Sequence, residues 1–185
     1  RVNTPEELAA AFEQARREAQ NSTGDATIFL ERALDAVHQI EVQIIADNIG
    51  TTQAIGIRDC TVQRHHRKVF EESDSSILSA EQKQTLSEMA IHLCREARYR
   101  NAGTVEFLYA PGSHEFWFLE MNPCLDVEHP ITEATTGLDL VKLQLTIARG
   151  KQLAAVLPVS NGQAVRVRRY TKDPDRGFAA GAGNT

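Results

Sequence analysis

Two glutamates and an asparagine are the residues whose types and spacing point most directly to chemistry in this sequence. Glu106, Glu120 and Asn122 lie on or directly after two apolar stretches, residues 103–109 and 116–121. Both stretches alternate as β-strands do, and the turn-forming segment Ala-Pro-Gly-Ser-His joins them. We therefore predict a β-hairpin that carries all three polar side chains.

The pairing of the two strands decides which side chains meet. With the turn centred near Ser113, the predicted partners are Glu106 with Glu120, Leu108 with Phe118, and Thr104 with Asn122. Alternation along the strands places these six residues on one face of the hairpin. The other, apolar face then consists of Val105, Phe107, Trp117, Leu119 and Met121.

Two carboxylates that face each other across a hairpin destabilise it unless a cation neutralises them. Oxygen ligands from Glu106, Glu120 and Asn122 suit Mg²⁺ or Mn²⁺, and Mg²⁺ usually completes its shell with waters and substrate phosphates. The residues by themselves leave a second interpretation open. In it, this side of the hairpin is a solvated sheet face that tolerates two acids.

Reactive groups also occur in two other stretches. Residues 63–68 read Gln-Arg-His-His-Arg-Lys, which indicates either a solvated basic loop or an anion site for phosphate, carbonate or nucleic acid. Glu128, just past the hairpin, is either a general base or one more surface acid. His129 and Glu133 have the helical spacing of metal ligands, but Pro130 lies between them and we predict no metal site there.

These residues need a scaffold of helices and strands. Helices are predicted over residues 5–20, 79–97 and 138–148, the first two opened by capping boxes at Thr4 and Ser79. Strands are predicted over residues 27–30, 40–46, 52–57, 103–109, 116–121 and 164–170, with the strand at 40–46 half-buried. Residues 58–72 show no clear periodicity. Hairpins mixed with helices predict the α+β class.

Composition limits the class of protein. The chain has 185 residues, a net charge of −5, 42% hydrophobic and 24% charged residues, which is typical of a soluble protein with one large domain or one and part of a second. The acidic balance argues against binding nucleic acid by bulk charge, and no apolar run approaches the ~20 residues of a membrane span. The cysteines at positions 60, 94 and 124 are widely spaced, which argues against disulfides and zinc and favours a reducing compartment.

Several longer motifs occur along the chain in a fixed order. They are Ile40-Glu41-Val42-Gln43, Arg58-Asp59-Cys60-Thr61-Val62-Gln63-Arg64-His65-His66-Arg67-Lys68, Ala102-Gly103-Thr104-Val105-Glu106-Phe107, Phe118-Leu119-Glu120-Met121-Asn122, Val127-Glu128-His129-Pro130-Ile131-Thr132-Glu133 and Gly137-Leu138-Asp139-Leu140-Val141. In order and spacing the chain resembles the biotin carboxylase component of biotin-dependent carboxylases, an ATP-grasp fold. The resemblance runs almost from end to end.

The resemblance implies an ATP-dependent ligase reaction. ATP activates bicarbonate as carboxyphosphate, and the carboxyl group then passes to N1 of biotin on a carrier domain. The implied cofactors are ATP and two Mg²⁺ or Mn²⁺ ions, with biotin as the carried substrate. The implied partners are the biotin carboxyl carrier domain, a carboxyltransferase and a second copy in a homodimer. The implied location is the cytoplasm, or the mitochondrial matrix in a eukaryote.

The resemblance also implies a role for individual residues. Those implied to bind ATP are Glu31, Arg32, Ala33, Leu34, Gln39, Gln63, His66, Glu106 and Glu120. The implied metal ligands are Glu106, Glu120 and Asn122, and the implied bicarbonate contacts are Lys68, Val127 and Glu128. Glu128 matches the base that deprotonates bicarbonate, and Arg168 matches an arginine near biotin.

Four positions depart from the family pattern. Cys124 replaces an arginine that grips bicarbonate and stabilises the biotin enolate, and Asp126 replaces a glutamine. Gln39 replaces a histidine that contacts the nucleotide, and Arg166 replaces an acidic residue. Losing a permanent cation and adding a carboxylate oppose the binding of an anion.

These departures keep other hypotheses open. One is a catalytically degraded relative that serves as a nucleotide-binding or subunit-interaction module. Another is a different ATP-grasp ligase, of the carbamoyl-phosphate synthetase type, which shares the metal pair but not the long motif of residues 58–68.

The resemblance implies a domain organisation as well. It assigns residues 1–34 to the end of the ATP-grasp lid subdomain, 35–150 to the large catalytic subdomain and 151–185 to the start of the biotin carboxylase C-terminal domain. In the family, a glycine-rich lid loop and two ATP-binding lysines precede the position of Arg1. We therefore expect a fragment without the N-terminal domain, one that is itself inactive and binds ATP weakly.

Overall fold

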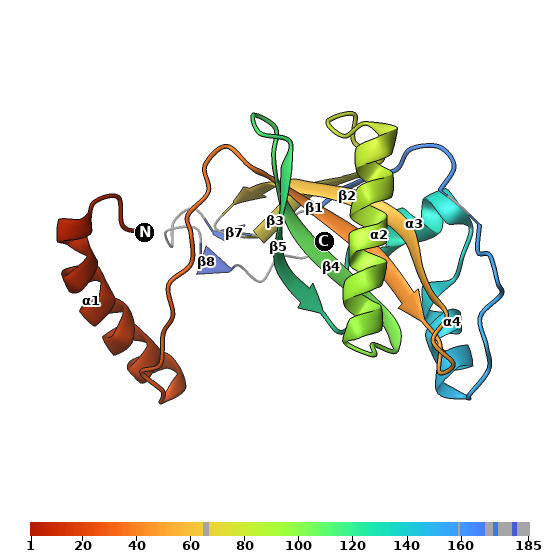
Figure 1. The fold of residues 1–185 in the computed structure, drawn as a ribbon, viewed down its shortest axis with the longest axis horizontal. Helices are drawn as coiled ribbons and strands as arrows, with labels where there is room; N and C mark the ends of the chain where they lie inside the picture. The colour runs from red at the N-terminus through yellow and green to blue at the C-terminus, as the bar shows by residue number, and fades with distance from the viewer. Residues whose placement is uncertain (65–66, 159, 169–171, 174–178, 181–185) are drawn as a thin grey trace. The chain divides into compact units, whose positions relative to one another are not determined.

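The computed structural model describes residues 1–64, 67–158, 160–168, 172–173 and 179–180. The chain divides into two compact units, Arg1–Asp35 and Ala36–Thr185. The first contains helix α1 (Pro5–Thr23) and the extended segment after it, and the second contains all the other helices and strands that are described (Figure 1).

The first unit differs from the prediction in two places. Helix α1 begins after Thr4, but the predicted capping box is wrong, because the Thr4 side chain makes no cap hydrogen bond. Instead the Glu7 carboxylate accepts a hydrogen bond from the backbone N–H of Asn3 at 3.0 Å. The strand expected over residues 27–30 is not formed. The described part of this unit offers no second strand with which such a segment could form a ladder.

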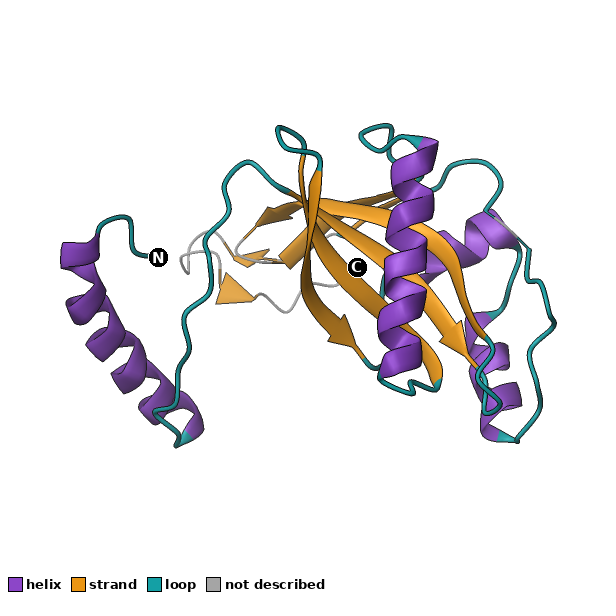
Figure 2. Ribbon diagram, viewed as in Figure 1, coloured by secondary structure: helices purple, strands orange, loops and turns teal. Residues whose placement is uncertain are grey.

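The second unit is built on a six-stranded antiparallel sheet with the order β5-β4-β1-β2-β3-β6. Its strands are β1 (His38–Ala46), β2 (Thr52–Arg64), β3 (Arg67–Ser73), β4 (Asn101–Ala110), β5 (Glu115–Asn122) and β6 (Val165–Val167). A separate pair joins β7 (Lys172–Asp173) to β8 (Ala179–Ala180). The helices are α2 (Ala80–Glu96), α3 (His129–Thr136) and α4 (Leu140–Ala148). Sheet and helices together confirm the predicted α+β class (Figure 2).

Helix α2 covers one face of the sheet (Figure 1). Its predicted capping box is confirmed: Ser79 Oγ accepts from the Gln82 N–H at 3.2 Å, and Gln82 Oε1 accepts from the Ser79 N–H at 2.9 Å. The core under this helix consists of Ile40, Val42, Ile44, Leu78, Leu86, Ala90, Cys94, Val105, Phe107 and Tyr109. The opposite face of the sheet has a smaller core under α4, consisting of Ile45, Ile55, Ala102, Leu140, Ile147, Leu153 and Leu157.

The stretch without clear periodicity, residues 58–72, contains the second half of the long strand β2 and most of its partner β3. Hairpin β1–β2 was predicted, but β2 runs on to Arg64 and then pairs with β3. The prediction of a half-buried β1 is wrong, because Glu41 and Gln43 are as fully buried as the isoleucines beside them. Alternation of apolar and polar residues marks β1 as a strand, but it does not show that the polar side chains pair inside the fold and are buried.

The β4–β5 hairpin follows the predicted register only in part. Glu106 faces Glu120 and Thr104 faces Asn122, as predicted, but the register shifts beyond Glu106. Leu119 is the extra residue of this bulge. From Phe118 back to Glu115, the side chains of β5 therefore lie on the opposite face of the hairpin from the predicted one. Phe118 lies opposite Phe107 and Trp117 lies opposite Leu108. The rings of Phe107 and Phe118 make an edge-to-face contact with their centroids 6.3 Å apart.

Two further predictions can be compared with the structure. Helix α4 begins later than expected, at Leu140, because the Asp139 side chain caps it and accepts from the Lys142 N–H at 2.8 Å. Strand β6 is confirmed over its three residues, whereas the predicted continuation over 169–170 lies outside the described residues. None of the helices described is long and apolar enough to cross a bilayer.

Candidate functional site

A row of charged residues crosses four strands on the face of the sheet opposite α2. Glu120 on β5 faces Glu106 on β4, Glu106 faces Glu41 on β1, and Glu41 faces Arg58 on β2. Three adjacent carboxylates repel one another and need cations on both sides. Arg58 supplies one from within the row, and Lys68 on β3 supplies another.

Lys68 joins two of these carboxylates. Its Nζ lies 3.1 Å from Glu106 Oε1 and forms a second ion pair with Glu41 Oε1. Glu41 is completely buried and Glu106 is 2% exposed. Burial alone would lower the pKa of Lys68, but the two carboxylates raise it above its usual value, so the ammonium stays charged.

The two carboxylates respond in opposite directions. Burial would raise the pKa of Glu41, but the charges of Arg58 and Lys68 lower it below its usual value. Burial and then the charge of Glu41 raise the pKa of Glu106, against the effect of Lys68. Glu106 is therefore the carboxylate of this row that would gain most from a further cation.

The three predicted metal ligands do lie together at the end of β4 and β5. Asn122 Nδ2 donates to Glu106 Oε1 at 2.8 Å and to Glu120 Oε1 at 3.5 Å, and Glu120 is exposed. In the part of the chain that the structure describes, no three His, Cys, Asp or Glu side chains form a metal cluster. Two carboxylates and an amide oxygen nevertheless fit a hard cation that takes its other ligands from water and phosphate.

Two of the predicted nucleotide residues belong to the same network. The Gln39 side chain on β1 donates to the Glu106 carboxylate, and the Gln63 side chain on β2 donates to Gln39 Oε1. Gln63 also donates to the Cys60 carbonyl at 2.9 Å. Strands β1, β2 and β4 thus bring these three side chains into one hydrogen-bonded chain.

Glu128 and Arg168 meet although they are far apart in the sequence. Glu128 directly precedes α3 and is 3% exposed, and Arg168 Nη1 lies 3.4 Å from its Oε1. The backbone N–H of Arg168, just after β6, donates to the Val69 carbonyl of β3 at 2.9 Å. This hydrogen bond extends the β3–β6 pairing and brings the arginine to the acid. Val127, the predicted bicarbonate contact next to Glu128, is exposed.

Cys124 and Asp126, two of the residues that depart from the family pattern, contact each other. Cys124 Sγ lies 3.5 Å from Asp126 Oδ1. Asp126 Oδ2 is buried, and within the described residues it has no hydrogen-bond partner. Desolvation, then the hydrogen bond to Asp126 and its charge, raise the pKa of Cys124, so this side chain is a neutral thiol at neutral pH.

The remaining predicted residues belong to the first unit or lie outside the described residues. Glu31, Arg32, Ala33 and Leu34 belong to the first unit, where the first three are exposed and Leu34 is half-buried. His66 lies outside the described residues.

Two important residues were missed by the sequence analysis, namely Glu41 and Arg58. Both appeared only within family motifs: Glu41 was expected to face water from a half-buried strand, and Arg58 lies in the stretch without clear periodicity. A partial signal was available: Glu41 and Gln43 alternate with apolar residues on the first strand, and Arg58 directly follows the predicted return strand of the same hairpin. Buried charges are rare unless they are paired, so their pairing marks a site.

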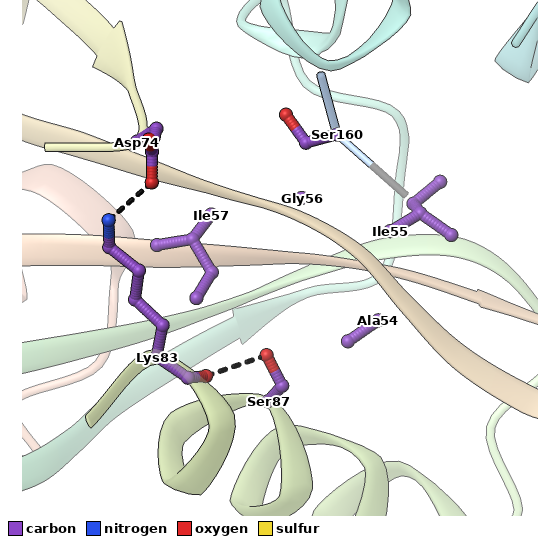
Figure 3. A pocket seen from close by; sticks show the side chains of 8 residues that line it. All are labelled: Ala54, Ile55, Gly56, Ile57, Asp74, Lys83, Ser87 and Ser160. Carbon is purple, nitrogen blue, oxygen red and sulfur yellow. Dashed lines mark hydrogen bonds and ion pairs between the residues drawn. The ribbon is translucent and has the colours of Figure 1, made fainter. Parts of the chain in front are cut away.

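A separate pocket of about 230 Å³ lies beside residues 54–57 of β2, between α2 and the segment that holds Ser160 (Figure 3). Its lining residues are Ala54, Ile55, Gly56, Ile57, Asp74, Lys83, Ser87 and Ser160. The Lys83 ammonium pairs with Asp74, and the Ser87 hydroxyl donates to the Lys83 carbonyl at 2.8 Å. None of the predicted site residues lines this pocket, so it is not the site assembled above.

Comparison with known proteins gives consistent matches. Residues 1–156 match the family described as "Carbamoyl-phosphate synthase L chain, ATP binding domain". The mitochondrial methylcrotonoyl-CoA carboxylase subunit alpha of Mus musculus is 40% identical over 185 residues, which cover 98% of this chain and 26% of that protein. Biotin carboxylase 2 of Bacillus subtilis is 41% identical over 180 residues, which cover 96% of this chain and 40% of that protein.

A solved structure matches over nearly the whole chain. It is the biotin carboxylase domain dimer of Hydrogenobacter thermophilus 2-oxoglutarate carboxylase, in complex with MgADP, ADP and bicarbonate. The TM-score is 0.87 at 35% identity, and the match covers 95% of this chain and 39% of that one. This chain therefore spans between about a quarter and two fifths of the length of these relatives.

Proposed function

Since this chain belongs to the family of the carbamoyl-phosphate synthase L chain ATP-binding domain, we propose that it carries the ATP-dependent carboxylation of biotin by bicarbonate. Its fold is the predicted ATP-grasp fold of biotin carboxylase domains. The observation that carries the proposal is the position of Lys68 between Glu41 and Glu106, beside Glu120 and Asn122. Phosphoryl transfer depends mainly on positioning the reactants and on neutralising their charge. Lys68 supplies a fixed positive charge, and Glu106, Glu120 and Asn122 supply oxygen ligands for a cation.

The nucleotide and its metal occupy the β4–β5 end of the site in this proposal. Gln39, Gln63, Glu106 and Glu120 bind ATP, together with His66 and the hinge residues Glu31, Arg32, Ala33 and Leu34. Glu106, Glu120 and Asn122 hold two Mg²⁺ or Mn²⁺ ions, which when bound neutralise phosphate charge. The raised pKa of Glu106 supports this role, because a cation relieves the repulsion between the carboxylates.

Bicarbonate binds between Lys68, the Val127 backbone and Glu128. Glu128 takes the bicarbonate proton, and the resulting carbonate oxygen attacks the terminal phosphorus of ATP as the bond to ADP breaks. The carbon–oxygen bond to phosphate in carboxyphosphate then breaks as the carboxyl group bonds to N1 of biotin, and the departing phosphate accepts the N1 proton. Arg168, whose Nη1 lies 3.4 Å from Glu128 Oε1, binds at the biotin end of the site in this proposal. Buried carboxylates of this kind serve as general bases when held in hydrogen-bond reach of the proton.

The proposal extends to partners and organisation. Residues 1–34, 35–150 and 151–185 are the end of the lid, the large catalytic subdomain and the start of the C-terminal domain. Biotin arrives on a carrier domain and leaves carboxylated for a carboxyltransferase, and two copies of the domain pair. The similar subunit of an acyl-CoA carboxylase and the similar domain that forms a dimer support these assignments.

A conservative variant of the base tests the proposed reaction. In the protein at its full natural length, we expect Glu128→Gln to lower ADP release in the presence of bicarbonate and biotin by about a hundredfold, because the amide cannot accept the proton. Glu96→Gln, at an exposed position at the end of α2, is the control and should match the wild type. Equal rates for the two variants would rule out Glu128 as the base.

A degraded relative that binds nucleotide or a subunit, without carboxylating biotin, is the second candidate. It is favoured by the neutral Cys124 thiol and by Asp126, whose buried Oδ2 has no hydrogen-bond partner in the described part of the chain. A carboxylate and a thiol give an incoming anion no positive charge.

Replacing both departed residues tests this alternative. If their loss limits the reaction, Cys124→Arg with Asp126→Gln should raise bicarbonate-dependent ADP release by about a hundredfold, since a charge-assisted contact in the transition state returns. Cys124→Ser with Asp126→Asn, which removes the carboxylate without adding a cation, is the control. An unchanged rate in the first double variant would show that these positions do not limit turnover.

A further inference from the structure

Arg58 is the largest of the completely buried side chains in the described structure, and the proposed reaction gives it no role. It lies on β2 directly across from Glu41. A guanidinium carries five N–H donors in a rigid fork, and burying it is costly unless those donors are used. Where the five donors go therefore shows what the side chain holds in place.

All five donors of Arg58 have acceptors. Nε and Nη2 bond Glu41 Oε2 at 3.1 Å and 3.0 Å. Nη1 bonds Gln43 Oε1 at 2.7 Å and Thr132 Oγ1 at 3.0 Å. Nη2 also donates a hydrogen bond to Thr104 Oγ1 at 3.2 Å. The guanidinium is thus fully satisfied by side chains alone.

These acceptors come from the elements that present the candidate site. Strand β1 supplies Glu41, whose other carboxylate oxygen pairs with Lys68. Strand β4 supplies Thr104. Helix α3 supplies Thr132, about one turn after Glu128, the residue that directly precedes the helix. The buried Arg58 guanidinium therefore connects Glu41, the ion-pair partner of Lys68, to helix α3, which directly follows Glu128.

We propose that Arg58 is a positioning residue for the reaction, which fixes Glu41 beneath Lys68 and ties α3 to the sheet so that Glu128 keeps its place. The inference rests on the proposed function of Lys68 and Glu128. It predicts that the hydrogen bond from Arg58 to Thr132 of α3 contributes to bicarbonate binding and turnover as well as to stability.

The two threonines give a matched pair of variants. Thr104 is 0% and Thr132 is 1% exposed, and each accepts one hydrogen bond from Arg58. Thr104→Val and Thr132→Val each remove one hydroxyl acceptor with little change of shape. Strand β4 is held by ladders to both β1 and β5, whereas α3 has no ladder. A change at Arg58 itself is less informative, because it leaves the buried Glu41 without one of its cations and can unfold the protein.

Kinetics separate positioning from stability. In the protein at its full natural length, we expect Thr132→Val to lower kcat for bicarbonate-dependent ADP release, and to raise KM for bicarbonate, by about fivefold each. KM for ATP should stay within about twofold, as a change of 0.4 kcal/mol or less would give. Thr104→Val should leave KM for bicarbonate unchanged. Equal kinetic effects in the two variants would overturn the proposal.

Hydrogen exchange gives a readout that needs no activity. Thr132→Val should speed the exchange of the α3 amides over residues 129–136, while Thr104→Val should not. Unchanged α3 exchange in Thr132→Val would overturn the link between Arg58 and the helix. If the wild type shows no bicarbonate-dependent ADP release, the proposed function fails, and the exchange rates still decide whether Arg58 holds α3.

Discussion

Lys68 is shared by two carboxylates whose pKa values move in opposite directions. The pKa of Glu41 is lowered because Arg58 and Lys68 outweigh its burial. The pKa of Glu106 is raised because burial and the charge of Glu41 outweigh Lys68. At the scale of single residues, the folded protein therefore favours an ionised Glu41 and opposes the ionisation of Glu106. A cation at the β4–β5 end would reverse the second preference.

This raised pKa predicts a pH-dependent effect of Glu106→Gln. Below the unfolded-state pKa of Glu106 its ionisation costs nothing, and the cost grows as pH rises through the window between the unfolded and the higher folded value. We expect the variant to increase the free energy of unfolding more at pH 8 than at pH 5, because only the ionised form of Glu106 is destabilising in the folded protein.

Urea unfolding at the two pH values, followed by the fluorescence of Trp117, the only tryptophan, measures this difference. Glu96→Gln is again the control and should shift stability equally at both pH values. An increase for Glu106→Gln that is the same at pH 5 and pH 8, or larger at pH 5, would contradict the raised pKa.

The residues of the site could be predicted only where they lie close in sequence. Glu106, Glu120 and Asn122 belong to one hairpin, so the strand period and a turn were sufficient to bring them together. The ion pair of Lys68 on β3 with Glu41 on β1 depends on two successive hairpins that share strand β2, and no local pattern encodes it. The basic stretch 63–68 offered Lys68 only as one of several cations at a possible anion site, and the family resemblance then singled it out.

At the scale of elements, the sheet faces decide what the site contains. The predicted register of the β4–β5 hairpin is right up to Glu106 and wrong beyond it, because strand alternation carries no sign of the bulge at Leu119. The helix α3 was not predicted, since Pro130 and the threonines in its eight residues mask its period. The helix α2 was predicted because its cap and its apolar stripe agree.

Gly56 controls how closely α3 approaches β2. A Cβ at this position would lie 3.1 Å from both Cγ2 and Oγ1 of Thr132. We expect Gly56→Val to push the helix outward and to cost about 1–2 kcal/mol of unfolding free energy, as overpacking does. The faster exchange of α3 amides should accompany this loss.

Gly112, in the β4–β5 turn, provides the control for that variant. A Cβ there would meet nothing within 4 Å, so Gly112→Val should change stability by about 0.5 kcal/mol or less. Urea unfolding of both variants makes the comparison. Equal costs would mean that the approach of Thr132 to Gly56 is not tight.

At the scale of the whole molecule, the charged residues of the site gather in the second unit, Ala36–Thr185. The proposed adenine-binding residues, Glu31 to Leu34, lie in the first unit. The acids and cations of the sheet unit are arranged by antiparallel pairing alone, which explains how the row from Glu120 to Arg58 forms. The proposed nucleotide-binding residues thus include members of each unit, whereas the proposed bicarbonate-binding residues all belong to the second unit.

The most direct measurement is ADP release by the wild-type protein at its full natural length, with Mg-ATP alone, with bicarbonate, with free biotin, and with both. We expect release to require bicarbonate and to increase further with biotin, because Glu128 must first receive a bicarbonate proton and biotin then consumes the carboxyl group. Release that ignores both additions, or no release at all, would show that Lys68, Glu106 and Glu128 hold a nucleotide without carboxylating biotin.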